Sequence, residues 1–317
     1  MRYRKLGKWG VRVSEVGLGS WLTFGGSVEE DLAAACVLRA FERGVNFFDT
    51  ANVYAGGRAE EVIGRAIRGL PREEIVLATK VFFPMGEGPN AGGLSRKHVI
   101  EQCHASLGRL GVDYLDLYQC HRFDRDTPPE ETCRAMDDLI RGGKVLYWGV
   151  SEWSPDQMAD AVAYCEREGL HPPVSDQPRY SLLERGAEAE VLPACRDLGL
   201  GVAAFSPLAQ GVLTGKYRSV DEVPDGSRAA DAAGAGFIAR LLTAENLSRV
   251  DRLRPAAEEI GCTLGQLALA WALRRSEVSS AIVGATKLAH VDENVAASGL
   301  ALDEVLVDRI ETAVGAS

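Results

Sequence analysis

Residues 74–80, Glu-Ile-Val-Leu-Ala-Thr-Lys, form a short apolar run that ends in a lysine. A short run rich in aliphatic and β-branched residues is typical of a strand buried on both faces of a parallel sheet. Runs of the same character recur along the chain, and with residues 74–79 they predict strands at 45–48, 114–118, 145–150, 202–205 and 281–283. Several of these runs are followed at once by a polar residue.

Longer amphipathic stretches lie between the apolar runs and predict helices at 29–43, 58–68, 97–110, 129–141, 155–168, 184–198 and 249–260. Ser95 and the Ser154-Pro155 pair supply the chemistry of helix starts. Glycines follow the predicted helix ends, where a left-handed residue is favoured, at positions 44, 69, 111, 142, 169 and 199. The alternation of strand and helix predicts parallel strands joined by right-handed crossovers.

An α/β chain of this kind forms either an open doubly wound sheet or a closed (β/α)8 TIM barrel. The open dinucleotide-binding sheet would carry a G-x-G-x-x-G fingerprint, and residues 17–22, Gly-Leu-Gly-Ser-Trp-Leu, lack its third glycine. Polar residues at the carboxyl ends of several strands favour the barrel, whose active sites are built there. We expect one barrel domain over residues 1–317, with a short N-terminal β-hairpin and a mobile loop at 219–236.

Composition narrows the class of protein. The 317 residues are 46% hydrophobic and 25% charged, as in a globular chain. A net charge of −10 disfavours nucleic acid as a partner. We see no secretory signal and no apolar stretch long enough for membrane insertion. Seven scattered cysteines without a C-x-x-C pair indicate neither a zinc site nor a disulfide framework, so we expect a cytoplasmic enzyme with reduced thiols.

Four polar residues follow predicted strands closely: Asp49, Tyr54, Lys80 and His121. Each alone favours a structural role, such as a capping carboxylate, a packed aromatic ring or a lysine held by an acid. Together they would meet at one mouth of a barrel, which favours an active site. The remaining histidines, at 98, 104, 171 and 290, are expected on the surface.

These residues stand in motifs that resemble the aldo-keto reductase superfamily over nearly the whole chain. The motifs are Phe-Asp-Thr-Ala-Asn-Val-Tyr at 48–54, Ala-Thr-Lys at 78–80, Tyr-Gln-Cys-His at 118–121, Phe-Ser-Pro-Leu at 205–208 and Glu-Asn at 293–294. Residues 19–26, 93–98, 147–149 and 261–264 are most similar to the branch that contains the potassium-channel β subunits and their bacterial relatives.

The resemblance implies a barrel that binds a nicotinamide cofactor, usually NADPH, without a Rossmann fold and without a metal. It implies reduction of a carbonyl group by hydride transfer, with Tyr54 as proton donor and His121 orienting the carbonyl. Lys80 would lower the pKa of Tyr54, and Asp49 would pair with Lys80. The substrates expected are aldehydes, with ketones and dicarbonyls as further candidates.

Cofactor contacts carried over from the resemblance cover both ends of the dinucleotide. Ser151 and Gln177 match residues that hold the carboxamide, Phe205 matches the residue that stacks on the nicotinamide, and Arg228 matches a basic residue over the cofactor. The full expected set is Ser20, Trp21, Asp49, Ser151, Gln177, Phe205, Ser206, Pro207, Leu208, Gln210, Lys216, Arg228, Gly284, Thr286, His290, Glu293 and Asn294. NADH is the less favoured cofactor.

Alternatives remain open from the sequence. The channel branch permits a cofactor-binding regulatory subunit of a membrane channel with slow turnover, and a homo-oligomer, a tetramer or larger ring, follows from the same analogy. The channel β subunits carry Asn where this chain has His121, the residue typical of competent reductases. His290 replaces a Gln of that branch, and Glu152 departs from the usual Asn or Arg. A Schiff-base lyase using Lys80 is a third reading.

Overall fold

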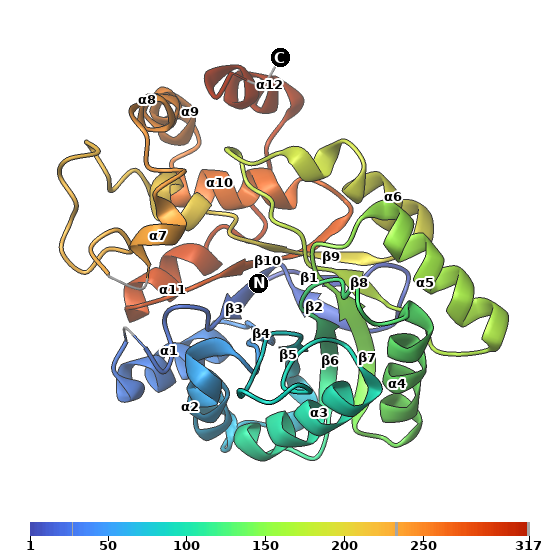
Figure 1. The fold of residues 1–317 in the computed structure, drawn as a ribbon. Coiled ribbons are helices and arrows are strands. Elements are labelled where there is room, and N and C mark those ends of the chain that lie inside the picture. Colours follow the sequence, from blue (N-terminus) through green and yellow to red (C-terminus); the bar gives the residue numbers. More distant parts are fainter. Residues whose placement is uncertain (27, 232–233, 316–317) are drawn as a thin grey trace.

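The computed structural model describes residues 1–26, 28–231 and 234–315. Within these residues, eight parallel strands close into a barrel in the order β10-β3-β4-β5-β6-β7-β8-β9, surrounded by helices (Figure 1). The strands are β3 Val16–Gly19, β4 Phe47–Asp49, β5 Val76–Val81, β6 Leu115–Cys120, β7 Val145–Val150, β8 Ser175–Asp176, β9 Gly201–Phe205 and β10 Val278–Val283. The expected (β/α)8 barrel is therefore confirmed.

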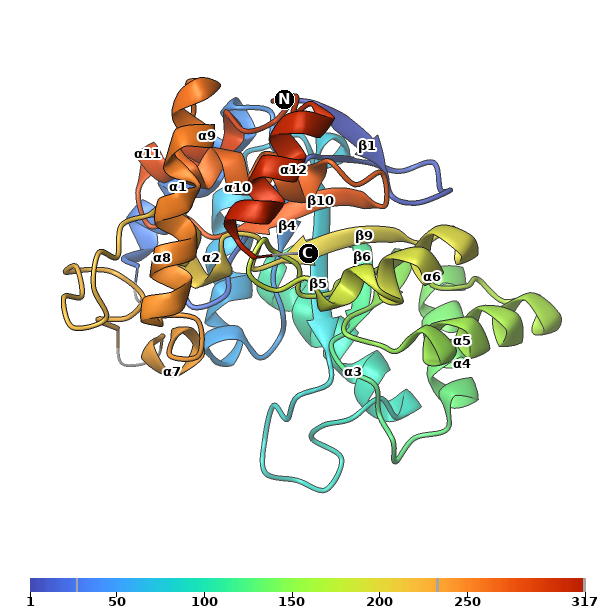
Figure 2. The ribbon, with the colours of Figure 1, turned by 90° about the horizontal axis from the view of Figure 1, so that it is seen from above.

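An antiparallel hairpin precedes the barrel, as expected from the sequence. It pairs β1 (Tyr3–Lys5) with β2 (Arg12–Ser14). Leu6 and Val13 are buried in one apolar cluster with barrel residues such as Phe47. Figure 2 shows the hairpin at one end of the barrel and the long loop between β5 and α3 (Arg96–Leu110) projecting from the other. The hairpin thus covers the amino end, and the carboxyl ends of the strands are left to form a site.

The outer helices are α1 Glu30–Glu42, α2 Arg58–Ile67, α3 Arg96–Leu110, α4 Pro129–Arg141, α5 Pro155–Glu168, α6 Val191–Leu198, α7 Ala235–Ile238, α8 Ala244–Arg252, α9 Arg254–Glu259, α10 Leu264–Leu273, α11 Leu288–Val295 and α12 Glu304–Ala313. Two predicted helices were wrong in extent. The helix predicted at 184–198 is α6, which begins at Val191, after a short 3-10 turn at Gly186–Glu188. The stretch 249–260 is divided between α8 and α9, because Pro255 lacks the N–H that a continuous helix needs.

Gly17 and Gly19, the two glycines of the incomplete fingerprint, serve strand packing. A Cβ on Gly17 would lie 2.8 Å from the Phe47 ring, and one on Gly19 would lie 2.6 Å from the Ile282 side chain. Both glycines lie in β3, which the sequence analysis did not identify as a strand, and β8 was missed as well because it spans only two residues. Glycine is needed here because neighbouring strands leave no space for a side chain.

Other local expectations met mixed outcomes. Ser95 and Ser154 cap α3 and α5, as predicted. Gly44, Gly111, Gly169 and Gly199 take positive φ at helix ends, whereas Gly69 and Gly142 do not. The predicted loop at 219–236 includes positions 232 and 233, which lie outside the described residues. Its last two residues, 235 and 236, belong to helix α7.

The expected surface position of His98 was wrong. Its side chain is 1% exposed on the inner face of α3, and burial lowers its pKa. Six of the seven cysteines are buried and all seven are free thiols. A buried free cysteine acts as a small hydrophobic residue. Among the described residues, no helix has the length and apolar character needed to cross a membrane.

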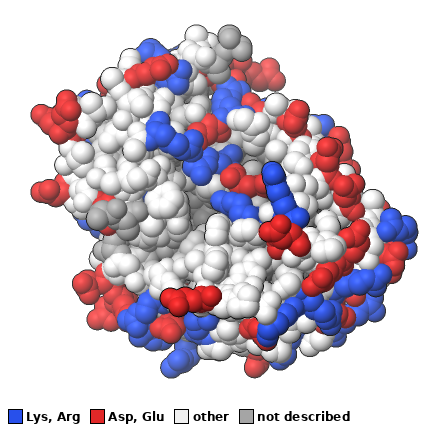
Figure 3. Space-filling view, viewed as in Figure 1, with Lys and Arg blue, Asp and Glu red and all other residues white. Residues whose placement is uncertain are grey.

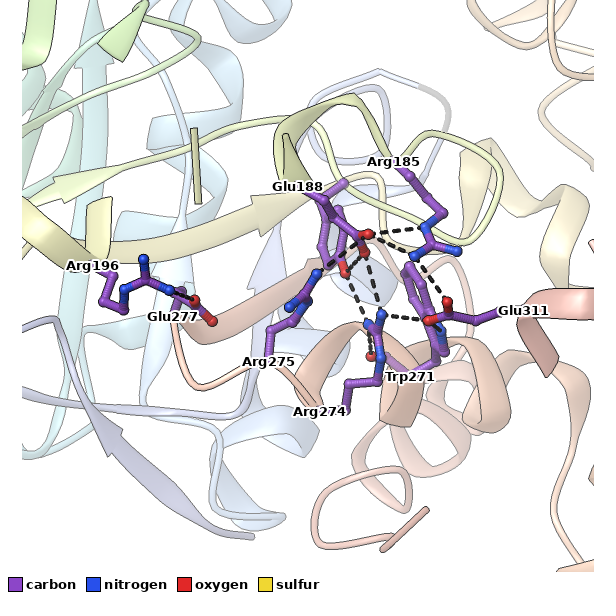
Figure 4. A network of polar contacts seen from close by, with 9 residues as sticks. Arg185, Glu188, Arg196, Trp271, Arg274, Arg275, Glu277 and Glu311 are labelled. Atoms are coloured by element: carbon purple, nitrogen blue, oxygen red, sulfur yellow. Dashed lines mark hydrogen bonds and ion pairs between the residues drawn. The ribbon is translucent and has the colours of Figure 1, made fainter. Parts of the chain in front are cut away.

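A network of ion pairs fastens α12 to the side of the barrel (Figure 4). Glu188 accepts hydrogen bonds from Arg185 at 2.6 Å and from Arg274 at 3.3 Å, and it pairs with Arg275 at 3.4 Å. Arg274 also pairs with Glu311 of α12 at 2.7 Å. The side chains are 14–39% exposed, so removing one partner would leave a partly buried charge unpaired, which costs more than breaking an exposed ion pair.

Candidate active site

Three of the four expected catalytic residues come from neighbouring strand ends, and the fourth from the turn that follows β4. Asp49 ends β4, Lys80 lies near the end of β5, His121 follows β6, and Tyr54 begins a 3-10 turn. Lys80 Nζ lies 2.5 Å from Asp49 Oδ1 and 3.5 Å from the Tyr54 hydroxyl. The structure therefore brings all four together at the carboxyl end of the barrel.

Asp49 is held by more than its lysine. Its second oxygen, Oδ2, accepts hydrogen bonds from Gln177 Nε2 at 2.9 Å and from Gln119 Nε2 at 3.2 Å. Lys80 also donates to the backbone oxygen of Thr50 at 2.8 Å. The buried ion pair is thus surrounded by hydrogen-bond partners, which such a pair needs in a low-dielectric interior.

Burial sets the protonation of the reacting groups. Burial and the charge of Asp49 raise the pKa of Tyr54 well above its usual value, and Arg122 opposes this rise. The lowering of this pKa by Lys80 stays a prediction. Burial lowers the pKa of Lys80, although Asp49 opposes this effect. Burial, Lys80 and Arg122 lower the pKa of His121 well below its usual value. At neutral pH the site therefore holds a protonated Tyr54 hydroxyl and a neutral His121 imidazole.

Aromatic rings surround these groups. The His121 ring packs edge-on against Tyr54, with centroids 5.6 Å apart, and against Phe83 at 4.9 Å. The Nδ1 atom of His121 is buried and has no hydrogen-bond partner in the described part of the chain. Phe83 belongs to the loop after β5, so this loop borders the expected catalytic residues. Trp153 is buried against the ring of Phe123.

A cleft of about 900 Å³ contains much of the expected cofactor set. The expected residues that line it are Ser206, Pro207, Leu208, Gln210, Lys216, Arg228, Gly284, Thr286, His290, Glu293 and Asn294. The other six do not line this cleft, and contacts join several of them at the catalytic end. Ser20 Oγ donates to Thr50 Oγ1 at 2.8 Å, and Ser151 Oγ donates to the backbone oxygen of Gln177 at 2.8 Å. Phe205 ends β9 and lies beneath the Arg179 guanidinium.

The cleft fits an anionic dinucleotide. Burial, Arg228 and Lys287 lower the pKa of Lys216, so positive charges lie close together around the cleft. The turn after β9 also holds non-glycine residues at positive φ, namely Ser206, Ala209 and Gln210. Strained backbone of this kind clusters at ligand sites, and a concentration of basic groups is stabilised by a bound phosphate. Lys287 is exposed and also lines this cleft.

The turn after β3 contacts α7 and the cleft residue Arg228 through Trp21. Trp21 packs edge-on against Phe237 of α7, with ring centroids 4.8 Å apart. The Arg228 guanidinium lies 5.5 Å from the Trp21 ring centroid. Figure 3 shows this face of the molecule hollowed near its middle, with basic side chains at the edge of the hollow.

Some residues beside the site were not predicted from the sequence. Gln119, Arg122 and Phe237 were not among the candidates. Period-two alternation could have identified Gln119, since it shares a strand face with His121 two positions later. No comparable signal marks Phe237, because its contact with Trp21 joins segments that are distant in sequence.

Comparison with known proteins agrees with this geometry. The Aldo/keto reductase family model matches residues 15–314. The chain is 44% identical over 319 residues to proteins of Arabidopsis thaliana and Oryza sativa subsp. japonica, each named a probable voltage-gated potassium channel subunit beta, with 99% of this chain and 97% of each relative covered. A Schizosaccharomyces pombe protein named a putative voltage-gated potassium channel subunit beta is 43% identical over 303 residues. The match covers 93% of this chain and 87% of that relative. The chain therefore belongs to the aldo/keto reductase family.

Proposed function

We propose that this oxidoreductase reduces carbonyl compounds, aldehydes above all, with NADPH as cofactor and Tyr54 as proton donor. The observation that carries the proposal is the position of the Tyr54 hydroxyl. It lies 3.5 Å from the Lys80 ammonium, next to His121, in a site adjoining a basic cleft of dinucleotide size. Ketones and dicarbonyls are further candidate substrates.

The protein's own groups would act on the carbonyl oxygen. When bound, the nicotinamide would supply the hydride to the carbonyl carbon. Tyr54, protonated because of its raised pKa, would donate its proton to the developing alkoxide. The charge left on the Tyr54 oxygen would then be stabilised by Lys80, which Asp49 holds in place. Electrostatic stabilisation by Lys80 is thus needed mainly after proton transfer.

His121 would orient the substrate. A neutral imidazole carries one N–H, and its Nδ1 is buried without a partner, so we assign the donor to Nε2. That atom would donate a hydrogen bond to the carbonyl oxygen and polarise it. A histidine kept neutral at physiological pH suits this role, since it adds no competing acid beside Tyr54.

The cofactor would be held along the cleft from the catalytic end outward. Ser151 and Gln177 would bind the carboxamide, and Phe205 would support the nicotinamide ring. Lys216 and Arg228 would bind the phosphates, and their charge favours NADPH over NADH. The remaining expected contacts, at Gly284, Thr286, His290, Glu293 and Asn294, would surround the adenosine end. We further propose that residues 1–317 form one domain acting in the cytoplasm, a compartment in which seven free thiols persist.

A second candidate function comes from the relatives named as channel subunits. The same cleft would then report cofactor state to a membrane channel with slow turnover. His121 favours the enzyme, because it completes a site able to polarise a carbonyl. Co-purification of the tagged protein with a membrane channel, together with NADPH binding but no turnover, would favour the subunit.

Steady-state oxidation of NADPH with a panel of small aldehydes tests the proposal. We expect turnover with several aldehydes and weaker cofactor binding for NADH. Borohydride treatment with substrate alone should attach nothing to Lys80, whereas a Schiff-base lyase would be trapped there. Tight NADPH binding without turnover on any aldehyde would contradict the enzyme proposal and support the regulatory one.

A further inference from the structure

Arg122 follows His121 and lies at the mouth of the site. Its Nη1 atom donates hydrogen bonds to the backbone oxygen of His121 and, at 3.4 Å, to Ser151 Oγ. Its guanidinium lies 5.9 Å from the ring centroid of Phe83, which itself packs against His121. These contacts hold a half-buried cation between the ends of β6 and β7.

The charge of Arg122 is not neutralised within the described residues, where it has no carboxylate within ion-pair distance. Nearby carboxylates have other partners. Glu152 accepts the backbone N–H of Arg179 at 3.0 Å, Asp124 accepts donors of its own loop, and Asp49 pairs with the catalytic lysine. In a chain of net charge −10 with many arginine–carboxylate pairs, a half-buried arginine without one indicates a place for an external anion.

The guanidinium is close enough to act on the reacting groups. After burial and Lys80, Arg122 is the third cause that lowers the pKa of His121, and it also opposes the rise in the pKa of Tyr54. A group bound to Arg122 would therefore lie near the carbonyl oxygen held by His121 and Tyr54. Of the five N–H donors of an arginine, those on Nε and Nη2 remain available for a ligand, and they form a planar fork that matches a carboxylate.

We propose that Arg122 binds a carboxylate carried by the carbonyl substrate, so that the preferred substrates are short oxo acids rather than neutral aldehydes. This inference rests on the proposed reductase function and names its substrate class. The Arg122 fork would then hold the carboxylate, with the Phe83 ring beside it, while His121 and Tyr54 hold the carbonyl oxygen. Arg122 is thereby a specificity-determining residue.

Matched pairs of aldehydes test the proposal: 4-oxobutanoate with butanal, and glyoxylate with acetaldehyde. The readout is the ratio of kcat/KM for the acid to that for its neutral twin. We expect Arg122→Met to lower this ratio about 10- to 100-fold, mostly through KM of the acid, since a charge-assisted pair is lost. Arg122→Lys should restore part of the ratio, because charge returns without the fork.

An arginine with only a structural or electrostatic effect on the catalytic groups would change both twins alike and leave the ratio unchanged. That outcome, or a wild-type protein that does not prefer either acid, would overturn the proposal. Arg125→Met is the control, because Arg125 is exposed on the same loop. It should leave the ratio and the activity as in wild type.

A measurement without any variant guards against a misfolded Arg122→Met protein. Butanoate should compete with butanal on the wild-type protein, whereas the uncharged butanamide should compete at least about tenfold more weakly. Equal inhibition by both compounds would contradict the inference. Failure of the reductase proposal is distinguishable, since then no aldehyde, acidic or neutral, would support NADPH oxidation.

Discussion

Gln177 Nε2 donates a 2.9 Å hydrogen bond to Asp49 Oδ2, joining the residue after β8 to the end of β4 across the inside of the barrel. This bond leaves Asp49 Oδ1 to Lys80. The Asp49–Lys80 ion pair is therefore held in place by a residue 128 positions from Asp49 in the chain. The same glutamine is an expected carboxamide contact, which would couple cofactor binding to the position of the ion pair.

Removing one member of this ion pair should destabilise the protein. Asp49→Asn leaves Lys80 buried without its counter-charge, and we expect a loss of about 3–5 kcal/mol in the free energy of unfolding. Adding Lys80→Met to Asp49→Asn should recover part of that loss, although both proteins lack activity. Urea unfolding monitored by circular dichroism measures this. A double variant less stable than Asp49→Asn would contradict the account.

The basic cleft should bind the phosphates of the cofactor. Lys216→Met should weaken NADPH binding about 10-fold or more, because charge-assisted contacts are lost. The same variant should weaken NADH binding less if Lys216 contacts the additional phosphate. Fluorescence titration of NADPH provides the dissociation constants. The matched control is Lys144→Met, because Lys144 is an exposed lysine before β7. This variant should bind NADPH with the affinity of wild type.

His121 should make stability depend on pH in a definite direction. Its pKa is lowered in the folded protein from 6.5, so below pH 6.5 the unfolded chain binds a proton that the folded chain does not. This contribution to stability is therefore present above pH 6.5 and is lost as the pH falls toward the folded pKa. His121→Asn should flatten the decrease in stability below pH 6.5, as measured by unfolding at several pH values. Identical slopes for the two proteins would exclude this assignment.

The network around Glu188 should be a stability determinant away from the site. Burial raises the pKa of Glu188, but its bonds to Arg185 and Tyr180 and the nearby charges outweigh this and lower the pKa to about 2. Because the folded pKa is lowered, the stabilisation is present above the unfolded value near 4.5 and is lost as pH falls toward 2. Glu188→Gln should therefore cost about 3 kcal/mol at pH 7.

The control for that network is Glu259→Gln, which breaks an exposed pair with Arg309. It should cost less than about 1 kcal/mol. Thermal unfolding of both variants at pH 7 and near pH 4 compares them. If Glu188→Gln and Glu259→Gln were equally mild at pH 7, the network would not fasten α12 in the way we infer.

Much of the fold was predictable because short apolar runs and amphipathic stretches alternate so regularly. The strand at 145–150 was predicted with its observed bounds, and five others differ from the structure at one or both ends. β3 and β8 were not predictable from apolar runs, since β3 contains Gly17 and Gly19 and β8 has two polar residues. Their places are set by the closure of the barrel, which is a tertiary constraint.

The site was predictable where position relative to a strand end carried the signal. This signal identified Asp49, Lys80 and His121. It did not identify Gln119, which lies within β6, two residues before His121. The pKa of Tyr54 could not be predicted from the sequence, because its direction depends on burial and on the distances to Asp49 and Arg122. The surface position predicted for His98 was wrong for a related reason. A polar residue on a helix was expected to face solvent, but His98 is buried.

The central claim is that Tyr54 delivers the proton, and a single-turnover measurement tests it most directly. NADPH-loaded protein is mixed with an aldehyde and the loss of NADPH absorbance is followed for wild type, Tyr54→Phe and Tyr114→Phe. Tyr114 is the matched control, because its ring contacts Arg72 just before β6, at the opposite end of the barrel. We predict that Tyr54→Phe binds NADPH like wild type but reduces the aldehyde at least about 100-fold more slowly, while Tyr114→Phe matches wild type. Wild-type reduction by Tyr54→Phe would contradict the account.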